Sequence, residues 1–399
     1  MRRALDKSCV IDALRGTFLK GFLSTSIFVS CSALYACKPR TFNASTSSLP
    51  SEPQASSTSD LDARRYEVWN LMRAEHLKDI QPQCEPQRYL PPKGVSRRGL
   101  AILLHGYSAC PDQYDVLGPK LAASGYEVLV PLFPGHGAKP LSMKPRKDDV
   151  EHVPRVGAGW GPFVSRVNEL GSLFDGERVL VGLSHGSSLA LRAIQKQPNL
   201  WGKAFLMAPK LTNETSFLKF MLSSPLHVLS INQLSESESM RTNPADYADQ
   251  KLLSMRSGWR ACSEVDVHPP ANRGGFCNFE NRHALAMFDF GETVIKSSEA
   301  MAKQGVPIST QVQFVLSEQD KGVCNNATQR VLTALVASGA RAQGCIMPEV
   351  VPHSMISTHD SPYDKPWTRP LFESAVEFFT QSNFLVGSSA TISSCQAQW

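Results

Sequence analysis

The chain has 399 residues, of which 42% are hydrophobic and 19% charged, and its formal net charge at pH 7 is +5. A chain of this length and apolar content can bury a large core, which excludes disorder throughout. Lysine and arginine are scattered along the sequence, so nucleic-acid binding is not expected. The ten cysteines form no C-x-x-C pair and no zinc-like spacing with histidine, which excludes zinc-finger and thioredoxin-like sites.

Residues 1–37 have the pattern of an export leader. Residues 1–20 carry five basic and two acidic side chains, and a short apolar, serine-rich run follows up to Cys37. Two ends of this leader are possible. Residues 34–37 (LYAC) resemble a bacterial lipobox, in which Cys37 would receive a lipid anchor. In the alternative, ordinary cleavage follows Ser32 and the protein is secreted.

Residues 38–60 follow the leader and include a Ser/Thr/Pro-rich stretch that is typical of a flexible linker. A linker directly after a modifiable cysteine is what a tethered exported domain needs. We therefore favour a membrane-anchored lipoprotein of the cell envelope, in the periplasm or at the outer membrane. Lys38 is not the Asp that would retain a lipoprotein in an inner membrane, which favours the outer one.

From residue 61 to about 385, short apolar runs alternate with stretches of helical spacing. The predicted strands are 99–104, 126–132, 178–183, 203–207, 311–316 and, weakened by Pro348, 345–351. The predicted helices are 112–124, 186–197, 328–338 and 365–381. This alternation predicts an α/β fold with a mostly parallel sheet and helices on both faces. Residues 209–298 break the pattern and are predicted to form a cap inserted over the carboxyl edge, and 386–399 to form a tail.

The sequence Gly182-Leu183-Ser184-His185-Gly186 is a G-x-S-x-G between a predicted strand and a predicted helix. A tight strained turn of this kind lifts the serine hydroxyl clear of the sheet. His105-Gly106-Tyr107 follows another strand end, so the backbone N–H groups of Tyr107 and His185 are candidate oxyanion donors.

A serine nucleophile needs a base, and the base needs an orienting acid. Asp320 follows the predicted strand 311–316, and His353 follows the last predicted strand. The chain order Ser184, Asp320, His353 is the order that this arrangement requires. Glu318 is the alternative acid and His359 the alternative base.

Residues 103–137 (LLHGYSACPDQYDVLGPKLAASGYEVLVPLFPGHG) and 181–194 (VGLSHGSSLALRAI) resemble the α/β-hydrolase superfamily. The similarity is greatest to its carboxylesterase and monoacylglycerol-lipase-like, or serine aminopeptidase-like, branch. The resemblance implies Ser184 as nucleophile, Asp320 as acid and His353 as base, with no metal or cofactor. It also implies a structural role for His136. The sequence of the predicted cap, the part that selects the substrate in this family, resembles no known cap, so the identity of the substrate is not predicted.

Seven cysteines lie beyond the leader and Cys37, and an exported chain can keep disulfides. We expect the pairs Cys84–Cys110, Cys262–Cys277 and Cys324–Cys345, with Cys395 left over. The function predicted from the sequence is hydrolysis of a small-molecule carboxylic ester. The alternatives are a serine peptidase of the same fold and a tethered binding protein without catalysis.

Overall fold

A computed structural model describes residues 58–74, 80–137, 153–211, 256–258, 275, 278–318, 320, 323–356, 365–385 and 392–395. The chain divides into two compact units, Met1–Ala63 and Arg64–Trp399, and the sheet and the candidate site belong to the second. The predicted leader, its Cys37, the linker and most of the predicted cap lie outside the described residues.

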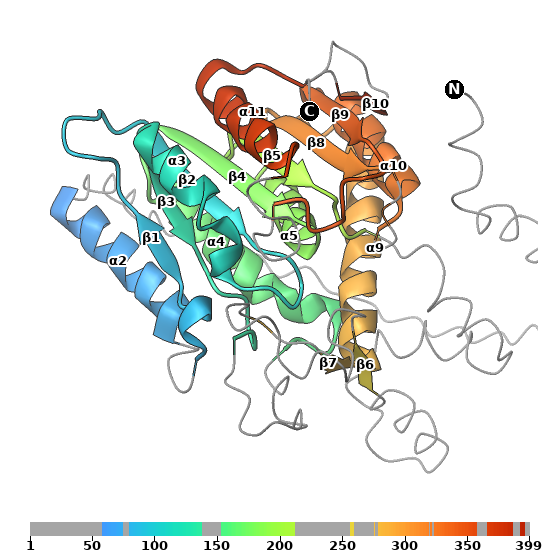
Figure 1. Cartoon of the computed structure of the whole chain (residues 1–399), viewed down its shortest axis with the longest axis horizontal. Helices are drawn as coiled ribbons and strands as arrows, with labels where there is room; N and C mark the ends of the chain where they lie inside the picture. Colours follow the sequence, from blue (N-terminus) through green and yellow to red (C-terminus); the bar gives the residue numbers. More distant parts are fainter. Residues whose placement is uncertain are drawn as a thin grey trace, which may run out of the picture. The chain divides into compact units, whose positions relative to one another are not determined.

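An eight-stranded sheet forms the centre of this unit, in the order β1-β3-β2-β4-β5-β8-β9-β10 (Figure 1). Only β1 runs antiparallel to its neighbour, β3, and every other pair in this sheet is parallel. The strands are β1 (Gln87–Tyr89), β2 (Gly99–Leu104), β3 (Tyr126–Val130), β4 (Glu177–Leu183), β5 (Lys203–Met207), β8 (Gln311–Ser317), β9 (Ala342–Met347) and β10 (Ile392–Ser394). A separate antiparallel pair joins β6 (Arg256–Gly258) to β7 (Asn278–Glu280).

Helices cover both faces of the sheet. Those described are α2 (Thr58–Ala74), α3 (Leu117–Ala123), α4 (Gly161–Ser172), α5 (His185–Lys196), α9 (Asn281–Gln304), α10 (Asn325–Ala337) and α11 (Thr368–Gln381). Side chains of α3 and α11 share one core cluster with alternate residues of β2, β4 and β5. A side chain at Gly182 would instead meet Ser187 of α5, so α5 lies on the opposite face. There α5 contacts α4 and α9, and α9 contacts α10.

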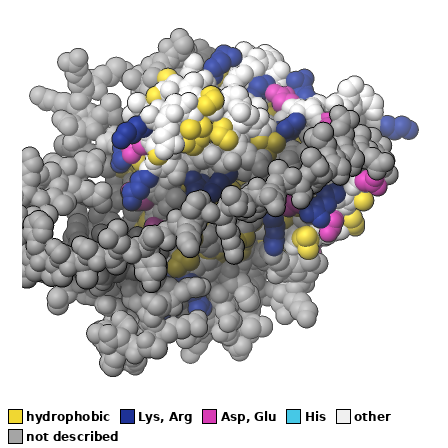
Figure 2. Space-filling model, turned by 180° about the vertical axis from the view of Figure 1, so that it is seen from behind, with side chains coloured by type: hydrophobic (Ala, Val, Ile, Leu, Met, Phe, Trp, Pro, Cys, Tyr) yellow, Lys and Arg dark blue, Asp and Glu magenta, His cyan; other side chains and the backbone are white. Residues whose placement is uncertain are grey.

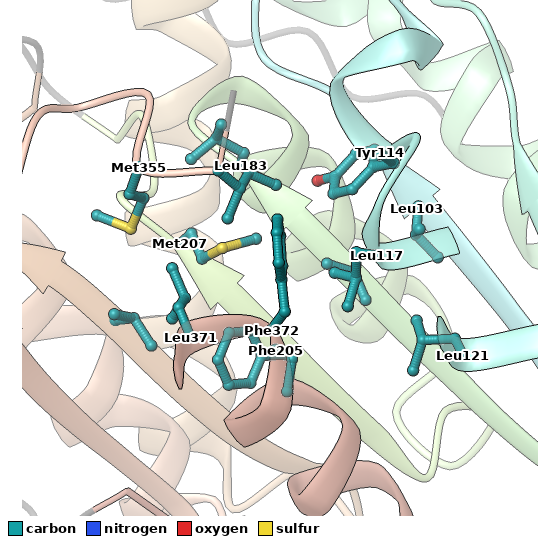
Figure 3. Close-up of a cluster of buried hydrophobic side chains, with 14 of the residues drawn as sticks. Leu103, Tyr114, Leu117, Leu121, Leu183, Phe205, Met207, Met355, Leu371 and Phe372 are labelled. Atoms are coloured by element: carbon teal, nitrogen blue, oxygen red, sulfur yellow. The ribbon is translucent and has the colours of Figure 1, made fainter. Parts of the chain in front are cut away.

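The core on the first face is continuous. Figure 3 shows Leu117 and Leu121 of α3, and Leu371 and Phe372 of α11, gathered around Phe205 of β5. The central strands β2 and β5 are buried along their whole length, as a parallel strand between two helical layers should be. This packing holds the carboxyl ends of the strands in fixed positions.

The structure confirms the predicted fold class, with differences at the edges. The last predicted strand, 345–351, is wrong in its bounds, because β9 begins at Ala342 and ends before Pro348, which has no N–H for the ladder. The predicted helix 112–124 is a 3-10 turn, Pro111–Tyr114, followed by α3. The short strands β1, β6, β7 and β10 and the helices α2, α4 and α9 were not predicted. Part of the predicted tail forms β10.

Two disulfides are described, and one of them corrects a prediction. Cys84 bonds Cys110, as expected. Cys345 bonds Cys395, so the predicted pair Cys324–Cys345 is wrong, and so is the prediction that Cys395 is left over. The reason is β10, which pairs with β9 and brings Cys395 beside Cys345. Cys324 is also disulfide-bonded. The predicted pair Cys262–Cys277 lies outside the described residues.

No described helix combines the length and the hydropathy that crossing a bilayer requires. On the face drawn in Figure 2, the lysine and arginine side chains of the described residues are dispersed among neutral ones rather than gathered in a single patch.

Candidate active site

The turn from β4 to α5 places Ser184 in a strained conformation. Its φ is 56° and its ψ is −118°, a combination that side chains of L-residues rarely adopt. Its N–H donates to Met207 O at 2.9 Å, which ties the turn to the end of β5. The residue is largely buried, and it lies directly before the first turn of α5, whose N-terminal end favours negative charge.

The two glycines of the motif are required by close backbone approaches. A Cβ on Gly182 would lie 2.5 Å from the backbone nitrogen of Ser187. A Cβ on Gly186 would lie 1.9 Å from Leu104 O, so α5 rests directly on the end of β2. Both distances are far below van der Waals contact. A side chain at either position would therefore collide with the backbone of a neighbouring element.

Two buried serines fix α5 to the segment after β5. Ser187 Oγ donates to Met207 O at 2.8 Å, and Ser188 Oγ donates to Lys210 O at 2.6 Å. The backbone N–H of Lys210 in turn donates to Ser184 O at 3.0 Å. These hydrogen bonds lock the Ser184 turn to the neighbouring strand end.

The loop after β2 is held beside Ser184. A Cβ on Gly106 would lie 3.8 Å from Ser184 Cβ, and Gly106 N–H donates to Gln113 Oε1 at 2.8 Å. His136 Nδ1 contacts Pro134 O at 3.0 Å; since a carbonyl can only accept, Nδ1 carries the hydrogen. His136 Nε2 then accepts from Ser108 N–H at 3.4 Å. His136 thus has the structural role that the resemblance implied.

His105 links the same two loops. Its Nδ1 lies 2.9 Å from Gly106 O, and its Nε2 accepts from the N–H of Phe133 at 3.1 Å. The Cys84–Cys110 disulfide braces the loop from its other end. The backbone that carries Tyr107 is therefore fixed on both sides.

Aromatic rings surround the side chain of His185. Trp160 lies nearest, with ring centroids 4.4 Å apart, and Tyr107 and Phe290 follow at 5.8 and 5.5 Å. Burial lowers the pKa of His185 well below its ordinary value, and the nearby His136 and Lys210 lower it further. This side chain is therefore neutral at physiological pH and part of the packed core.

Asp320 and His353 are brought together at the ends of neighbouring strands β8 and β9. His353 Nδ1 lies 2.6 Å from Asp320 Oδ2. The Asp320 side chain is 0% exposed, whereas that of His353 is 28% exposed. Oδ1 of Asp320 accepts from Val323 N–H at 3.2 Å. Because an ionised carboxylate only accepts, Nδ1 carries the hydrogen and Nε2 is left as the acceptor.

Of the two alternative residues, the acid Glu318 is described by the structure and the base His359 is not. Glu318 is exposed, and its N–H donates to Met347 O at 3.0 Å in the turn after β8. The geometry therefore favours Asp320 over Glu318 as the partner of His353. His359, the alternative base, lies outside the described residues.

Several residues that shape this site were not among those predicted from the sequence. Gln113 and His105 hold the loop after β2, and Trp160 packs on His185. Lys210, three residues beyond β5, is 3% exposed. Its signal in the sequence was a lysine three residues after the apolar run 203–207. Such a lysine is ordinarily solvent-exposed.

Comparison with known proteins places the chain in a family. Residues 101–368 match the model of the alpha/beta hydrolase family, and this span is more than half of the chain. The chain therefore belongs to the alpha/beta hydrolase family. No curated protein matches the sequence.

The chain is similar to solved structures at low sequence identity. A soluble variant of monoglyceride lipase from Saccharomyces cerevisiae, in complex with a substrate analogue, is 13% identical, with a TM-score of 0.50, over 73% of this chain and 89% of that one. The monoacylglycerol lipase of Paleococcus ferrophilus is 16% identical, with a TM-score of 0.47, over 77% of this chain and 100% of that one. A thermostable carboxyl esterase from Bacillus coagulans is 15% identical, with a TM-score of 0.46, over 74% and 92%.

Proposed function

We propose that the chain is a serine hydrolase that cleaves carboxylic esters through an acyl-enzyme on Ser184. The observation that carries this proposal is the 2.6 Å hydrogen bond between His353 and Asp320, at the same sheet edge as the strained Ser184 turn. An imidazole held by a buried carboxylate is the base that a serine hydroxyl needs. Membership of the alpha/beta hydrolase family supports the same reaction class.

In the proposed reaction, Ser184 Oγ bonds to the ester carbonyl carbon while its proton passes to Nε2 of His353. Asp320 stabilises the imidazolium that forms. The backbone N–H groups of Tyr107 and His185 are the proposed donors to the oxyanion. The imidazolium proton then moves to the departing alcohol oxygen as the ester C–O bond breaks. Water next attacks the acyl-enzyme and gives a proton to His353, which returns it to Ser184 Oγ as the acid leaves.

A fluorophosphonate probe tests the proposal, because it labels only an activated serine. We expect the wild-type protein to be labelled, and a folded Ser184→Ala variant to be neither labelled nor active. A folded wild-type protein that takes up no label would contradict the proposal and favour the alternative of a tethered binding protein. Labelling retained in Ser184→Ala would refute the assignment of the nucleophile.

The substrate class is tested separately. We expect turnover of p-nitrophenyl esters, with a preference that depends on acyl-chain length, and little turnover of amino-acid p-nitroanilides. Since most of the predicted cap lies outside the described residues, the ester series is needed to define the preferred acyl-chain length. Faster hydrolysis of the anilides would favour the serine peptidase of the same fold.

We also propose that Cys37 carries a lipid that tethers the domain to the cell envelope. The support is the lipobox-like LYAC sequence followed by the Ser/Thr/Pro-rich segment up to residue 60. Mass spectrometry of the mature N-terminus, expressed with its leader in a bacterial host, tests this. We expect a diacylated or triacylated Cys37, and an unmodified start at Ala33 would end the proposal.

A further inference from the structure

The turn after β2 that carries Tyr107 is strained. The N–H of Ala109 donates to Gly106 O at 3.1 Å, which closes a four-residue turn. Ser108 takes the third position of this turn with a φ of 66°, a conformation that is ordinarily left to glycine. A residue keeps such a conformation only where the surrounding contacts hold it there. Contacts to this turn therefore affect where the N–H of Tyr107 points.

A segment of the predicted cap lies directly on this turn. Gly275 has a φ of 121°, and a Cβ on it would lie 2.0 Å from Ser108 O and 3.3 Å from Ala109 Cα. A side chain at this position would push the two segments apart. Gly275, which belongs to the predicted cap 209–298, thus packs its backbone against the backbone of the turn. Strand β7 and helix α9 follow it in the chain.

The side chain of Gln81 fastens Gly275 in that place. Its Nε2 donates to Gly275 O at 2.9 Å, and its Oε1 accepts from Gly275 N–H at 3.3 Å. A single carboxamide thus pairs with both backbone groups of one residue, as a neighbouring antiparallel strand would. The two hydrogen bonds join segments that are 194 positions apart in the sequence.

The backbone of Gln81 belongs to the fixed frame around the turn. Its N–H donates to Gly137 O at 2.8 Å, in the loop after β3, and its carbonyl accepts from Cys84 N–H at 2.8 Å. Cys84 is bonded to Cys110, the residue that follows the turn. Gln81 therefore binds the frame through its backbone and the cap segment through its side chain.

We propose that Gln81 is a positioning residue, which holds Gly275 on the strained turn and thereby keeps the N–H of Tyr107 aimed at the oxyanion. This inference rests on the function proposed above, because it takes Tyr107 as an oxyanion donor. It assigns to Gln81 no contact with the substrate. An oxyanion donor acts only at hydrogen-bonding distance from the oxygen on which charge develops. Movement of the turn therefore lowers the rate even where the nucleophile and the base are unchanged.

The test compares a p-nitrophenyl ester with its thiono analogue, in which sulfur replaces the carbonyl oxygen. Sulfur is a weak hydrogen-bond acceptor, so hydrolysis of the thiono ester draws little on the oxyanion donors. The ratio of the two kcat/KM values reports on those donors and does not depend on the amount of active enzyme. Loss of one whole donor lowers kcat about 10²- to 10³-fold, and a displaced donor should cost less. We expect Gln81→Leu to lower the ratio about tenfold, through kcat for the oxygen ester.

Gln313→Leu is the matched control. Gln313 is buried near the start of β8, where its Nε2 donates to Phe314 O at 2.7 Å and its Oε1 accepts from Leu385 N–H at 3.0 Å. Its carboxamide also binds two backbone groups, but toward the amino end of the strand, away from Ser184. We expect Gln313→Leu to lower stability at least as much as Gln81→Leu and to leave the ratio unchanged.

Two further variants change the same contact. In Gly275→Ala the added Cβ would displace the cap segment from Ser108 O, so the ratio should fall as it does in Gln81→Leu. Gln81→Glu keeps a polar end but presents an acceptor to Gly275 O, which needs a donor. If Gln81→Leu does not fold, the same fall in the ratio is expected of Gln81→Glu.

The outcomes separate this inference from the proposed function. If folded Gln81→Leu loses the same factor on both esters, the inference is overturned, because general loosening gives that result. Fluorophosphonate labelling of Ser184 would then still support the hydrolase. Wild-type protein that takes no label would remove both the proposed function and this inference. An equal fall of the ratio in Gln313→Leu would also contradict the inference.

Discussion

The Nδ1 of His353 and Oδ2 of Asp320 are 2.6 Å apart, across two loops that leave neighbouring parallel strands. The carboxylate fixes the tautomer that leaves Nε2 as an acceptor. An amide in place of the carboxylate can hold the opposite tautomer. We therefore expect Asp320→Asn to lower kcat about 10⁴-fold with little change in fold. Steady-state ester hydrolysis measures this.

The matched control for that variant is Glu318→Gln, two residues earlier. Glu318 is exposed, so its charge is screened by solvent. We expect Glu318→Gln to keep kcat within a factor of two or so of wild type. Similar losses in the two variants would argue that the loop as a whole, rather than the Asp320–His353 pair, supports turnover.

Gly186 sets how closely α5 approaches β2, so Gly186→Ala should destabilise the protein. The added Cβ would lie 1.9 Å from Leu104 O, and backbone must move to make room. We expect a loss of about 2 kcal/mol or more in the free energy of unfolding, measured by urea denaturation. Gly161→Ala is the control, because a Cβ there meets nothing within 4 Å. A Gly186→Ala midpoint equal to that of Gly161→Ala would contradict the close approach.

The Cys84–Cys110 disulfide should matter for both stability and turnover. It closes a sequence separation of 26 residues and braces the loop that carries Tyr107. We expect Cys84→Ala/Cys110→Ala to lose about 3 kcal/mol of stability. Its kcat should also fall, measured well below its unfolding midpoint, because the proposed oxyanion donors become mobile.

The second disulfide, Cys345–Cys395, serves as the control for removal of Cys84–Cys110. Cys345–Cys395 closes a separation of 50 residues at the other side of the sheet. Its removal should cost a similar amount of stability and leave kcat of the remaining folded protein near wild type. Equal kcat losses in the two double variants would mean that global loosening, and not the Tyr107 loop, sets the rate.

The buried His185 predicts a pH dependence of stability. Burial lowers its pKa in the folded state, so below about pH 6.5 the unfolded chain binds a proton that the folded chain does not. The free energy of unfolding should therefore fall on acidification below pH 6.5, by at most about 1.4 kcal/mol per pH unit from this residue, and show no such dependence above it. Urea denaturation at pH 7, 6 and 5 measures the slope.

A His185→Met variant isolates that effect, since methionine packs well among aromatic rings. His283, whose pKa burial and then the charges of Arg155 and Arg282 lower to about 4, contributes a slope of the same sign in both proteins. The free energy of unfolding of the wild type should thus fall relative to that of His185→Met as pH falls from 6.5 to 5. A difference between them that is independent of pH would contradict a neutral, buried His185.

Much of the sheet was predictable because its central strands are buried on both faces and therefore appear as continuous apolar runs. β2 and β5 were predicted with the bounds that the structure has. β1 and β10 have three residues each and are partly exposed, so they carry no such run. The start of β9, Ala-Gln-Gly, is short of large apolar side chains, which is why the predicted strand began too late.

The site was predictable where its chemistry shows as a motif at a strand end. The G-x-S-x-G turn is of this kind, and the pairing of Asp320 with His353 followed from strand order. The pairing of Cys345 with Cys395 was not predictable, because it depends on β10, a strand that has no apolar run in the sequence. The burial of Lys210 was also hidden, since it depends on α9 crossing at Gly291, a contact between distant segments.

The strand β10 has a consequence for how the protein behaves in concentrated solution. Without it, β9 would present an open ladder of N–H and C=O groups that another molecule could extend. The three residues of β10 occupy that ladder, and the disulfide to Cys345 keeps them there. Reduction of this disulfide would therefore allow β10 to leave and expose the hydrogen-bonding edge of β9. We expect the protein to self-associate on treatment with a thiol, in addition to any unfolding.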